Sequence, residues 1–298
     1  MIHQVVANDV GFTEGPVITQ AGETVFTSID RGVVYVSRDG VTKVLSETGG
    51  GPNGATEGRD GQIYIAQNGG THPARPWPGI CGGVQVISPS GEWSWLTQDP
   101  VSPNDLCFGP DGLLWLTDPT RRRPERDDGR LWRCDPETGF SELLVSLPWY
   151  PNGIGFGLES DCVYVAHTRD GQIIRFPIDA SSRLGPPEVF IQLDHGVPDG
   201  FAFDVENNLT VAAVGAEGEP GDIQTYDREG KLVDVFDGAF SQKCTNVAIG
   251  SGRLIVTDAD AGTVIEVADW PTEGLPLHPH REAAVIEAAE AIAVPANE

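Results

Sequence analysis

Six side chains that carry oxygen recur at nearly regular intervals along this chain of 298 residues. They are Glu14, Asn53, Asn104, Asn152, Asp199 and Asn246, separated by steps of 39, 51, 48, 47 and 47 residues. Four of them lie in closely related turns, GPNGATEG at 51–58, SPNDLCFG at 102–109, YPNGIGFG at 150–157 and VPDGFAFD at 197–204. Carboxylate and amide oxygens are the usual protein ligands of calcium-like cations. A fold that gathered these turns would therefore create a metal site.

Turn chemistry is the alternative explanation of the same pattern. Asn, Asp and Gly after Pro suit tight turns and need no ligand. That explains the Pro and Gly well, but Glu14 is not a favoured turn former, and the position is never Ser or Gly in six copies. The pattern favours metal binding for the set as a whole, and for any single copy the turn role stays open.

The elements that would position these residues are short strands. Each turn runs into a β-rich segment, followed by a second apolar run such as GLLWLTD at 112–118 and by a third run led by Gly. A repeat of about 40–50 residues built from short strands is typical of a β-propeller blade. Five units add a fourth run, and the sixth does not.

The segment IHQVVAN at 2–8 is β-like and is expected to complete the sixth unit, so that no long strand edge is left unpaired. The sequence thus predicts an all-β protein, a six-bladed β-propeller closed by the N-terminal strand. Residues 1–270 form a single domain in this prediction. Residues 271–298 form a C-terminal tail that is partly helical, because EAAVIEAAEAIA at 282–293 has high helix propensity.

Composition narrows the partners and the setting. The net charge of −25 argues against a nucleic-acid partner and against an anionic membrane surface, since both need clustered Lys and Arg. No apolar run approaches the roughly 18 residues that span a bilayer, and no secretory signal is visible. Five cysteines without C-x-x-C spacing indicate a reduced, cytoplasmic protein. We expect a monomer or a weak homo-oligomer.

Longer motifs support a family resemblance. They are FTEGP at 12–16, S-P-N-D-L-x-F-x-x-D-G-x-L-W-x-T-D-P at 102–119, Y-P-N-G-I-x-F at 150–156 and VPDGFAFD at 197–204. In order and spacing, over about residues 5–268, the chain resembles the superfamily of gluconolactonases, regucalcin (senescence marker protein) and luciferin-regenerating enzyme. The resemblance implies a six-bladed propeller with one catalytic divalent metal ion at the mouth of the channel.

The resemblance also implies roles for individual residues. Glu14, Asn152 and Asp199 match the metal ligands, and Asp199 also matches the general base. Asn104 matches a catalytic asparagine that contacts the metal, its water or the substrate. Calcium is the expected ion, and Zn²⁺, Mn²⁺, Mg²⁺ or Fe²⁺ are also compatible with oxygen ligands. No ligand role is carried over to Asn53 or Asn246.

One departure concerns the substrate. Regucalcin-like members carry an Arg that reaches the sugar two residues before the equivalent of Asn104, and here that residue is Ser102. Sugar lactones therefore stay possible, while a less polar lactone or ester becomes credible. Long loops at 68–83 and 118–129 are candidates for binding it. The predicted substrate-binding residues are Asn104, Ser102, Arg121, Trp149, Tyr150 and His72.

Two functions from different classes follow. The first is a metal-dependent lactonase, a carboxylic ester hydrolase in which a divalent ion polarises the carbonyl and Asp199 takes a proton from the attacking water. Direct attack by Asp199 as nucleophile is a variant of it. The second is a non-catalytic propeller that binds calcium or another protein. The charged Asp199, at a position that is an amide in most repeats, favours the enzyme.

Overall fold

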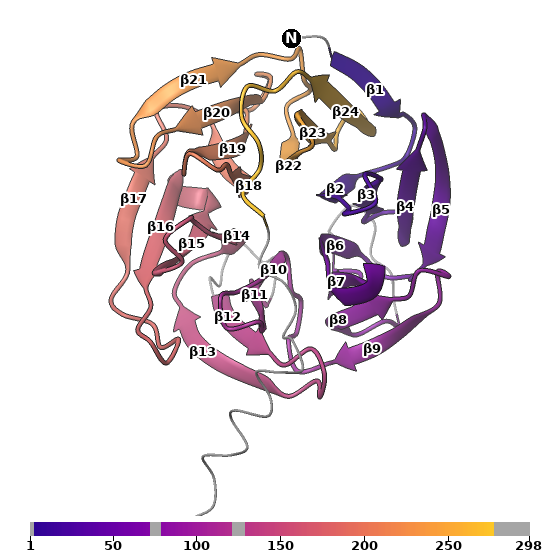
Figure 1. Cartoon of the computed structure of the whole chain (residues 1–298), viewed down its shortest axis with the longest axis vertical. Helices are drawn as coiled ribbons and strands as arrows, with labels where there is room; N and C mark the ends of the chain where they lie inside the picture. The colour runs from indigo at the N-terminus through magenta and orange to yellow at the C-terminus, as the bar shows by residue number, and fades with distance from the viewer. Residues whose placement is uncertain (1–2, 72–78, 121–128, 277–298) are drawn as a thin grey trace, which may run out of the picture.

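A computed structural model describes residues 3–71, 79–120 and 129–276. Within these residues the strands form six four-stranded antiparallel sheets, arranged as blades around a common axis (Figure 1). The predicted all-β, six-bladed propeller is therefore confirmed. His72 and Arg121, two of the predicted substrate-binding residues, lie outside the described residues, as does most of the C-terminal tail.

Each blade is one repeat of the sequence, with its first strand nearest the axis. Blade 1 is β2 (Thr13–Ile18), β3 (Thr24–Ser28), β4 (Val33–Arg38) and β5 (Val41–Glu47), and blade 2 is β6 (Pro52–Glu57), β7 (Ile63–Asn68), β8 (Gly82–Ile87) and β9 (Trp93–Thr97). Blade 3 is β10 (Leu106–Phe108), β11 (Leu114–Asp118), β12 (Gly129–Cys134) and β13 (Ser141–Leu147), and blade 4 is β14 (Pro151–Phe156), β15 (Cys162–His167), β16 (Gln172–Pro177) and β17 (Glu188–Gln192). Blade 5 is β18 (Val197–Phe203), β19 (Leu209–Val214), β20 (Asp222–Tyr226) and β21 (Leu232–Phe236), and blade 6 is β22 (Cys244–Gly250), β23 (Arg253–Asp258), β24 (Thr263–Ala268) and β1 (His3–Ala7). Two short 3₁₀ turns, η1 (Arg59–Gly61) and η2 (Thr168–Asp170), interrupt the loops.

The N-terminal strand closes the ring as predicted. β1 pairs antiparallel with β24, with His3 opposite Val267 and Val5 opposite Ile265. Without it, the backbone groups of β24 would form an open edge at the rim of blade 6. One blade is thus built from both ends of the chain.

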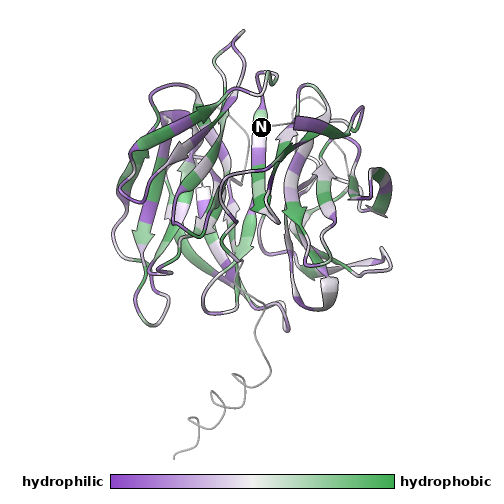
Figure 2. Ribbon diagram, turned by 45° about the horizontal axis from the view of Figure 1, so that its top comes forward, coloured by the Kyte–Doolittle hydropathy of each residue, from purple (hydrophilic) through white to green (hydrophobic). Residues whose placement is uncertain are grey.

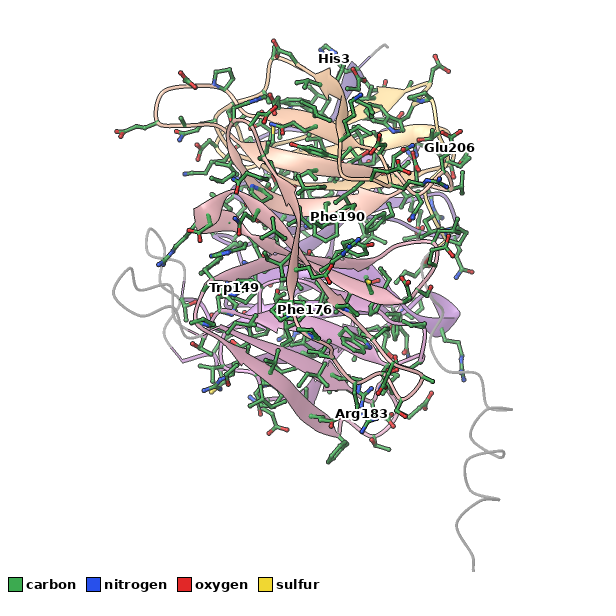
Figure 3. All side chains as sticks on the ribbon, turned by 90° about the vertical axis from the view of Figure 1, so that its left-hand side faces the viewer. His3, Trp149, Phe176, Arg183, Phe190 and Glu206 are labelled. Atoms are coloured by element: carbon green, nitrogen blue, oxygen red, sulfur yellow. The ribbon has the colours of Figure 1, made fainter. Side chains whose placement is uncertain are left out.

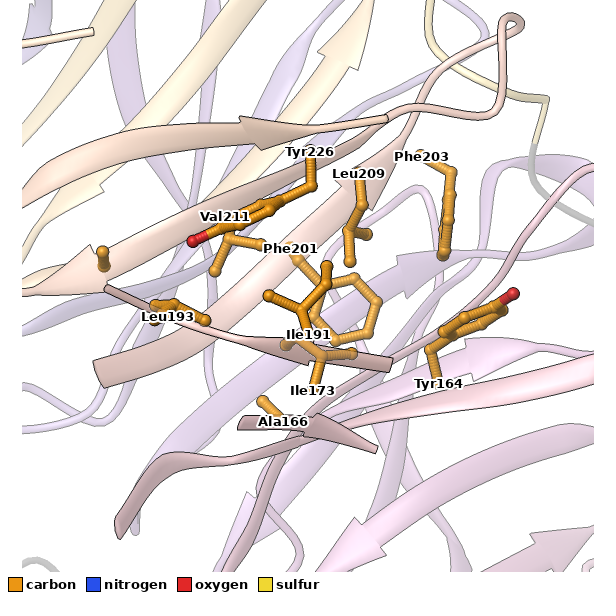
Figure 4. Packing of buried hydrophobic residues seen from close by; sticks show 11 residues of the cluster. Tyr164, Ala166, Ile173, Ile191, Leu193, Phe201, Phe203, Leu209, Val211 and Tyr226 are labelled. Atoms are coloured by element: carbon orange, nitrogen blue, oxygen red, sulfur yellow. The ribbon is translucent and has the colours of Figure 1, made fainter. Parts of the chain in front are cut away.

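Apolar layers hold neighbouring blades together. Between blades 4 and 5, Phe201 and Phe203 of β18 pack on Tyr164 and Ile173, and the ring centroids of Tyr164 and Phe203 lie 4.9 Å apart (Figure 4). The alternation of hydrophobic and hydrophilic residues along the strands is visible around the molecule (Figure 2). Because such layers are close-packed, they fix the positions of the innermost strands relative to one another.

The chain after β24 returns to the axis. It crosses toward blade 5 (yellow in Figure 1), where the Val205 amide donates to the Glu273 carbonyl at 3.0 Å and the Leu275 amide to the Phe203 carbonyl at 2.9 Å. Residues 273–276 line a cavity of about 750 Å³ on this face of the propeller. The turns that enter the innermost strands open on the opposite face.

Candidate functional site

The six predicted positions lie where neighbouring blades touch one another in a closed ring. The contacts run Gly15 with Asn53, Gly54 with Asn104, Thr117 with Asn152, Gly153 with Asp199, Gly200 with Asn246, and Thr245 with Thr13. The Gly54 amide donates to the Asn104 carbonyl at 2.8 Å, and the Thr117 hydroxyl to the Asn152 carbonyl at 2.7 Å. Six positions spread over 232 residues of sequence thus surround one mouth of the channel.

Glycine allows this close approach. A Cβ atom on Gly15 would lie 2.5 Å from the Asn53 carbonyl oxygen, and one on Gly153 would lie 2.5 Å from that of Asp199. Any larger residue would force these turns apart. The Gly of the repeated turn therefore serves contacts between blades as well as the turn itself.

Polar side chains at the ends of the second strands of blades 1, 2 and 3 accept hydrogen bonds from the backbone of the turns. Asp30 accepts the amide of Phe12 at 2.8 Å, Gln67 that of Gly51 at 2.6 Å, and Asp118 that of Ser102 at 2.9 Å. Each amide lies two residues before a ring residue. These hydrogen bonds fix the backbone from which Glu14, Asn53 and Asn104 project.

The ring side chains are withdrawn from solvent to different degrees. Glu14, Asn104 and Asn152 are each 5% exposed, and Asp199 is half-buried. The Asn104 amide nitrogen donates to the Tyr150 hydroxyl at 3.1 Å, and that of Asn152 to the Thr168 hydroxyl at 3.1 Å. Because the nitrogens are engaged in this way, the Oδ1 atoms are the groups that remain for a ligand.

This set of side chains fits a hard divalent cation. Glu14 and Asp199 supply carboxylates and the neighbouring asparagines supply neutral oxygens, the donor types that calcium prefers. Asn53 also fits a cation site, because both of its side-chain heteroatoms are buried without a hydrogen-bond partner in the described structure. In the described ranges no group of three or more His, Cys, Asp and Glu side chains is placed to hold a metal, so amide oxygens would have to complete the shell.

A residue that the sequence analysis did not single out lies beneath the ring. Asp105 occupies the position that is glycine in four of the other repeats, and its carboxylate accepts the Leu106 amide at 2.9 Å, the Ile154 amide and the side chain of Asn246. Burial raises the pKa of Asp105 to about 6. The Asp in SPND, where the related turns have Gly, was the signal that could have revealed it.

Asp105 and Asn246 lie between the other ring residues and the large cavity. Both side chains line the cavity of about 750 Å³, whereas Glu14, Asn152 and Asp199 do not. The cavity therefore belongs to the far half of the channel. Glu14, Asn152 and Asp199 lie on the other side of this pair.

Aromatic residues flank the ring next to blade 4. Trp149 stacks on His167 with ring centroids 4.5 Å apart, and the guanidinium of Arg169 lies 5.9 Å from the centre of the Tyr150 ring. Trp149 lies on the face opposite Glu206 (Figure 3). Two of the predicted substrate-binding residues, Trp149 and Tyr150, thus stand beside Asn104 and Asn152.

Ser102 has a different environment from the others. It is 1% exposed, and its hydroxyl donates to the Asn68 carbonyl at 3.0 Å and lies 2.9 Å from the Thr71 hydroxyl. The side chain therefore ties the loop after β7 to the turn that precedes Asn104. This position adds no cation to the site.

The closed six-bladed ring with an oxygen-rich channel mouth defines the class of protein. The SMP-30/Gluconolactonase/LRE-like region matches residues 12–260, and the chain belongs to this family. It is 24% identical over 295 residues to a gluconolactonase of Zymomonas mobilis, an alignment that covers 88% of this chain and 80% of that protein.

Two further relatives extend the comparison. The chain is 25% identical over 226 residues to the adipocyte plasma membrane-associated protein of Rattus norvegicus, covering 68% of this chain and 60% of that protein. The crystal structure of regucalcin from Agrobacterium tumefaciens, a calcium-binding protein, superposes with a TM-score of 0.76 at 20% identity, covering 94% of this chain and 98% of that one. The second likeness establishes the fold. In the described part of the chain, no helix is long and apolar enough to cross a membrane.

Proposed function

We propose that the chain is a divalent-metal-dependent hydrolase that opens a lactone, either a sugar lactone of the gluconolactonase type or a less polar lactone or ester. The observation that carries the proposal is the closed ring of turns that presents Glu14 and Asp199 among amides at one mouth of the channel. Membership of the family and the likeness to a gluconolactonase support the reaction class.

Glu14, Asn152 and Asp199 would hold the ion, with calcium as the expected metal. When bound, such an ion polarises the lactone carbonyl and lowers the pKa of a water molecule. The hydrogen bond from Asn152 to Thr168 orients the amide so that its oxygen faces away from the nitrogen's partner. Asn104, held by Tyr150, is the candidate for orienting the substrate.

Asp199 is the candidate base. Its carboxylate takes the proton of the water that attacks the carbonyl carbon, and a new C–O bond forms. The ring C–O bond then breaks, and Asp199 returns the proton to the departing oxygen, which leaves a hydroxy acid as the product. Proton transfer of this kind contributes about 10²–10⁴-fold to the rate. As a nucleophile, Asp199 would instead form an acyl-enzyme that water hydrolyses.

The wall beside blade 4 suggests how the substrate is selected. Trp149 and Tyr150 offer aromatic surface, and the buried hydroxyl of Ser102 is already engaged. We therefore propose that the substrate packs an apolar portion against this wall, and that Ser102 holds the loop rather than the substrate. A less polar lactone fits this arrangement as well as a sugar lactone does.

Hydrolysis of a panel of γ- and δ-lactones, polar and apolar, tests the proposal. The protein is first stripped with chelator and then assayed with and without added Ca²⁺, Zn²⁺, Mn²⁺ or Mg²⁺. We expect turnover of at least one lactone that disappears in chelator and returns with a metal. Tight calcium binding without turnover of any lactone would contradict the hydrolase and favour a non-catalytic calcium-binding propeller.

A further inference from the structure

Asn53 is the ring residue whose side chain the fold leaves unexplained. It is 1% exposed, and neither Oδ1 nor Nδ2 has a hydrogen-bond partner among the described residues. A buried primary amide without partners loses its hydration and gains nothing in exchange, which destabilises the folded protein. Packing of the described residues therefore does not explain why the Asn53 amide is buried.

Local turn chemistry does not supply that reason. Asn246, at the equivalent position of blade 6, accepts the amide of the next residue, Val247, at 2.8 Å. Asn68 accepts the amide of Gly70 at 2.9 Å. Asn53 stabilises no turn in this way, and its backbone carbonyl is held by the Thr27 hydroxyl at 2.7 Å. The turn would keep its shape with another side chain.

The position of Asn53 in its strand is that of two proposed metal ligands. In β6 the pairing runs from Pro52–Gln67 to Ala55–Ile65, so one extra residue is inserted between them. The same irregularity occurs in β14 around Asn152 and in β18 around Asp199. Because the bulge is at the same place, the three side chains leave their strands in the same sense.

The neighbours of Asn53 in the ring are a proposed metal ligand and the proposed catalytic asparagine. The carbonyl of Asn53 lies against Gly15, directly after Glu14, and the next amide, that of Gly54, donates to the Asn104 carbonyl. Asn53 thus stands between a proposed metal carboxylate and the proposed catalytic asparagine. Calcium takes six to eight oxygen ligands, so three protein side chains leave positions for another.

We propose that Asn53 is a further protein ligand of the divalent ion, coordinating it through Oδ1 from blade 2. This inference rests on the proposed function of the same ring. It accounts for the buried amide, since the cation supplies the partner that the protein does not. It also makes blade 2 a contributor to a site otherwise built from blades 1, 3, 4 and 5.

Calcium binding by calorimetry, together with thermal unfolding of stripped and calcium-loaded protein, tests the proposal without reference to activity. For Asn53→Leu we expect calcium affinity to fall about 10-fold or more, and the melting temperature of the stripped protein to stay equal or rise. The upward shift that calcium produces in wild type should shrink accordingly. Asn53→Asp should instead bind calcium more tightly than wild type, because ligand charge raises affinity.

Thr56→Val is the matched control. The Thr56 hydroxyl lies on the same strand and is also buried without a partner among the described residues, so its removal should leave calcium affinity unchanged. Wild-type affinity in both Asn53 variants would overturn the inference. If Asn53→Leu does not fold, unchanged or weaker binding by Asn53→Asp overturns it alone.

Glu14→Gln separates this inference from the proposed function. Loss of calcium binding in Glu14→Gln, with wild-type binding in the Asn53 variants, would refute the role of Asn53 and leave the proposed metal site standing. Wild-type binding in Glu14→Gln as well would refute the site itself.

Discussion

Asp105 of blade 3 and Asn246 of blade 6 hydrogen-bond to each other from opposite sides of the channel. A Cβ atom on Gly54 would lie 2.2 Å from the Asp105 carboxylate, and one on Gly200 would lie 2.0 Å from the Asn246 side chain. The pair is therefore enclosed by the turns of the neighbouring blades. It lies between the proposed metal ligands and the large cavity of the channel.

Asp105 should make the stability of the stripped protein depend on pH. Its pKa is about 6 in the folded state against 3.8 for a solvated Asp, because burial disfavours the charge. The folded state thus holds the proton more tightly, and the contribution of Asp105 to stability falls as pH rises from about 4 to 6. Asp105→Asn should remove this loss. Its free energy of unfolding, relative to that of wild type, should be higher at pH 7.5 than at pH 4 by up to about 3 kcal/mol.

Urea unfolding in chelator at the two pH values measures this difference. Asp234→Asn, at an exposed site on β21, controls for the lost charge and should show no such change. An equal effect of Asp105→Asn at both pH values would contradict the account of Asp105.

Tyr150 is expected to act through Asn104. Tyr150→Phe removes the hydroxyl that accepts the Asn104 amide, and the amide is then free to rotate. We expect kcat/KM for the best lactone to fall about 10-fold, the worth of one hydrogen bond. Tyr164→Phe, on β15 in the core, should change it little. Equal effects of the two variants in steady-state kinetics would argue against a positioning role.

Closure of blade 6 by β1 should be needed for stability. Deleting residues 1–7 exposes the edge of β24 and removes Ala7, a buried residue of the cluster around Phe26. We expect a fall in melting temperature on the order of 5–10 °C and a tendency to associate through the free edge. Val5→Thr, at a site 56% exposed, should cost far less in the same calorimetric scan. An unchanged melting temperature on deletion would show that β1 is dispensable.

The reactivity of the cysteine thiols should follow their burial. Cys81 is exposed, whereas Cys107, Cys134 and Cys244 are buried. Burial raises the pKa of Cys134 to about 11 and that of Cys107 well above its usual value, so neither is a thiolate near neutral pH. In an Ellman titration, Cys81 should react quickly in the native protein and these three only after unfolding. Rapid native modification of the buried three would contradict the described packing.

Much of the architecture was predictable because its causes are local. Strand alternation, turns and repeat length specify each blade separately, and the missing fourth strand of the last unit pointed to the N-terminus. The positions of the ring residues follow from the same repeat.

Contacts that depend on ring closure were not predictable. Asp105 and Asn246 are 141 residues apart. A six-bladed ring places blades 3 and 6 opposite each other, but the repeat does not show that these two side chains meet across the channel. The isolated amide of Asn53 is likewise visible only when all its neighbours are placed, since the same turn in blade 6 uses its Asn side chain for a local hydrogen bond. The sequence shows Ser102 at the position where regucalcin-like members carry an Arg. The structure shows that the Ser102 hydroxyl contacts Asn68 and Thr71 and so holds a loop.

The most direct test of the central claim is the rate of lactone hydrolysis by Asp199→Asn at saturating calcium. Asp222→Asn is the matched control, since Asp222 is a carboxylate of the same blade that contacts His195 and lies outside the ring. We predict that Asp199→Asn lowers kcat by about 10²–10⁴-fold, while Asp222→Asn stays close to wild type. Wild-type turnover by Asp199→Asn, or turnover that persists in chelator, would contradict the proposed mechanism.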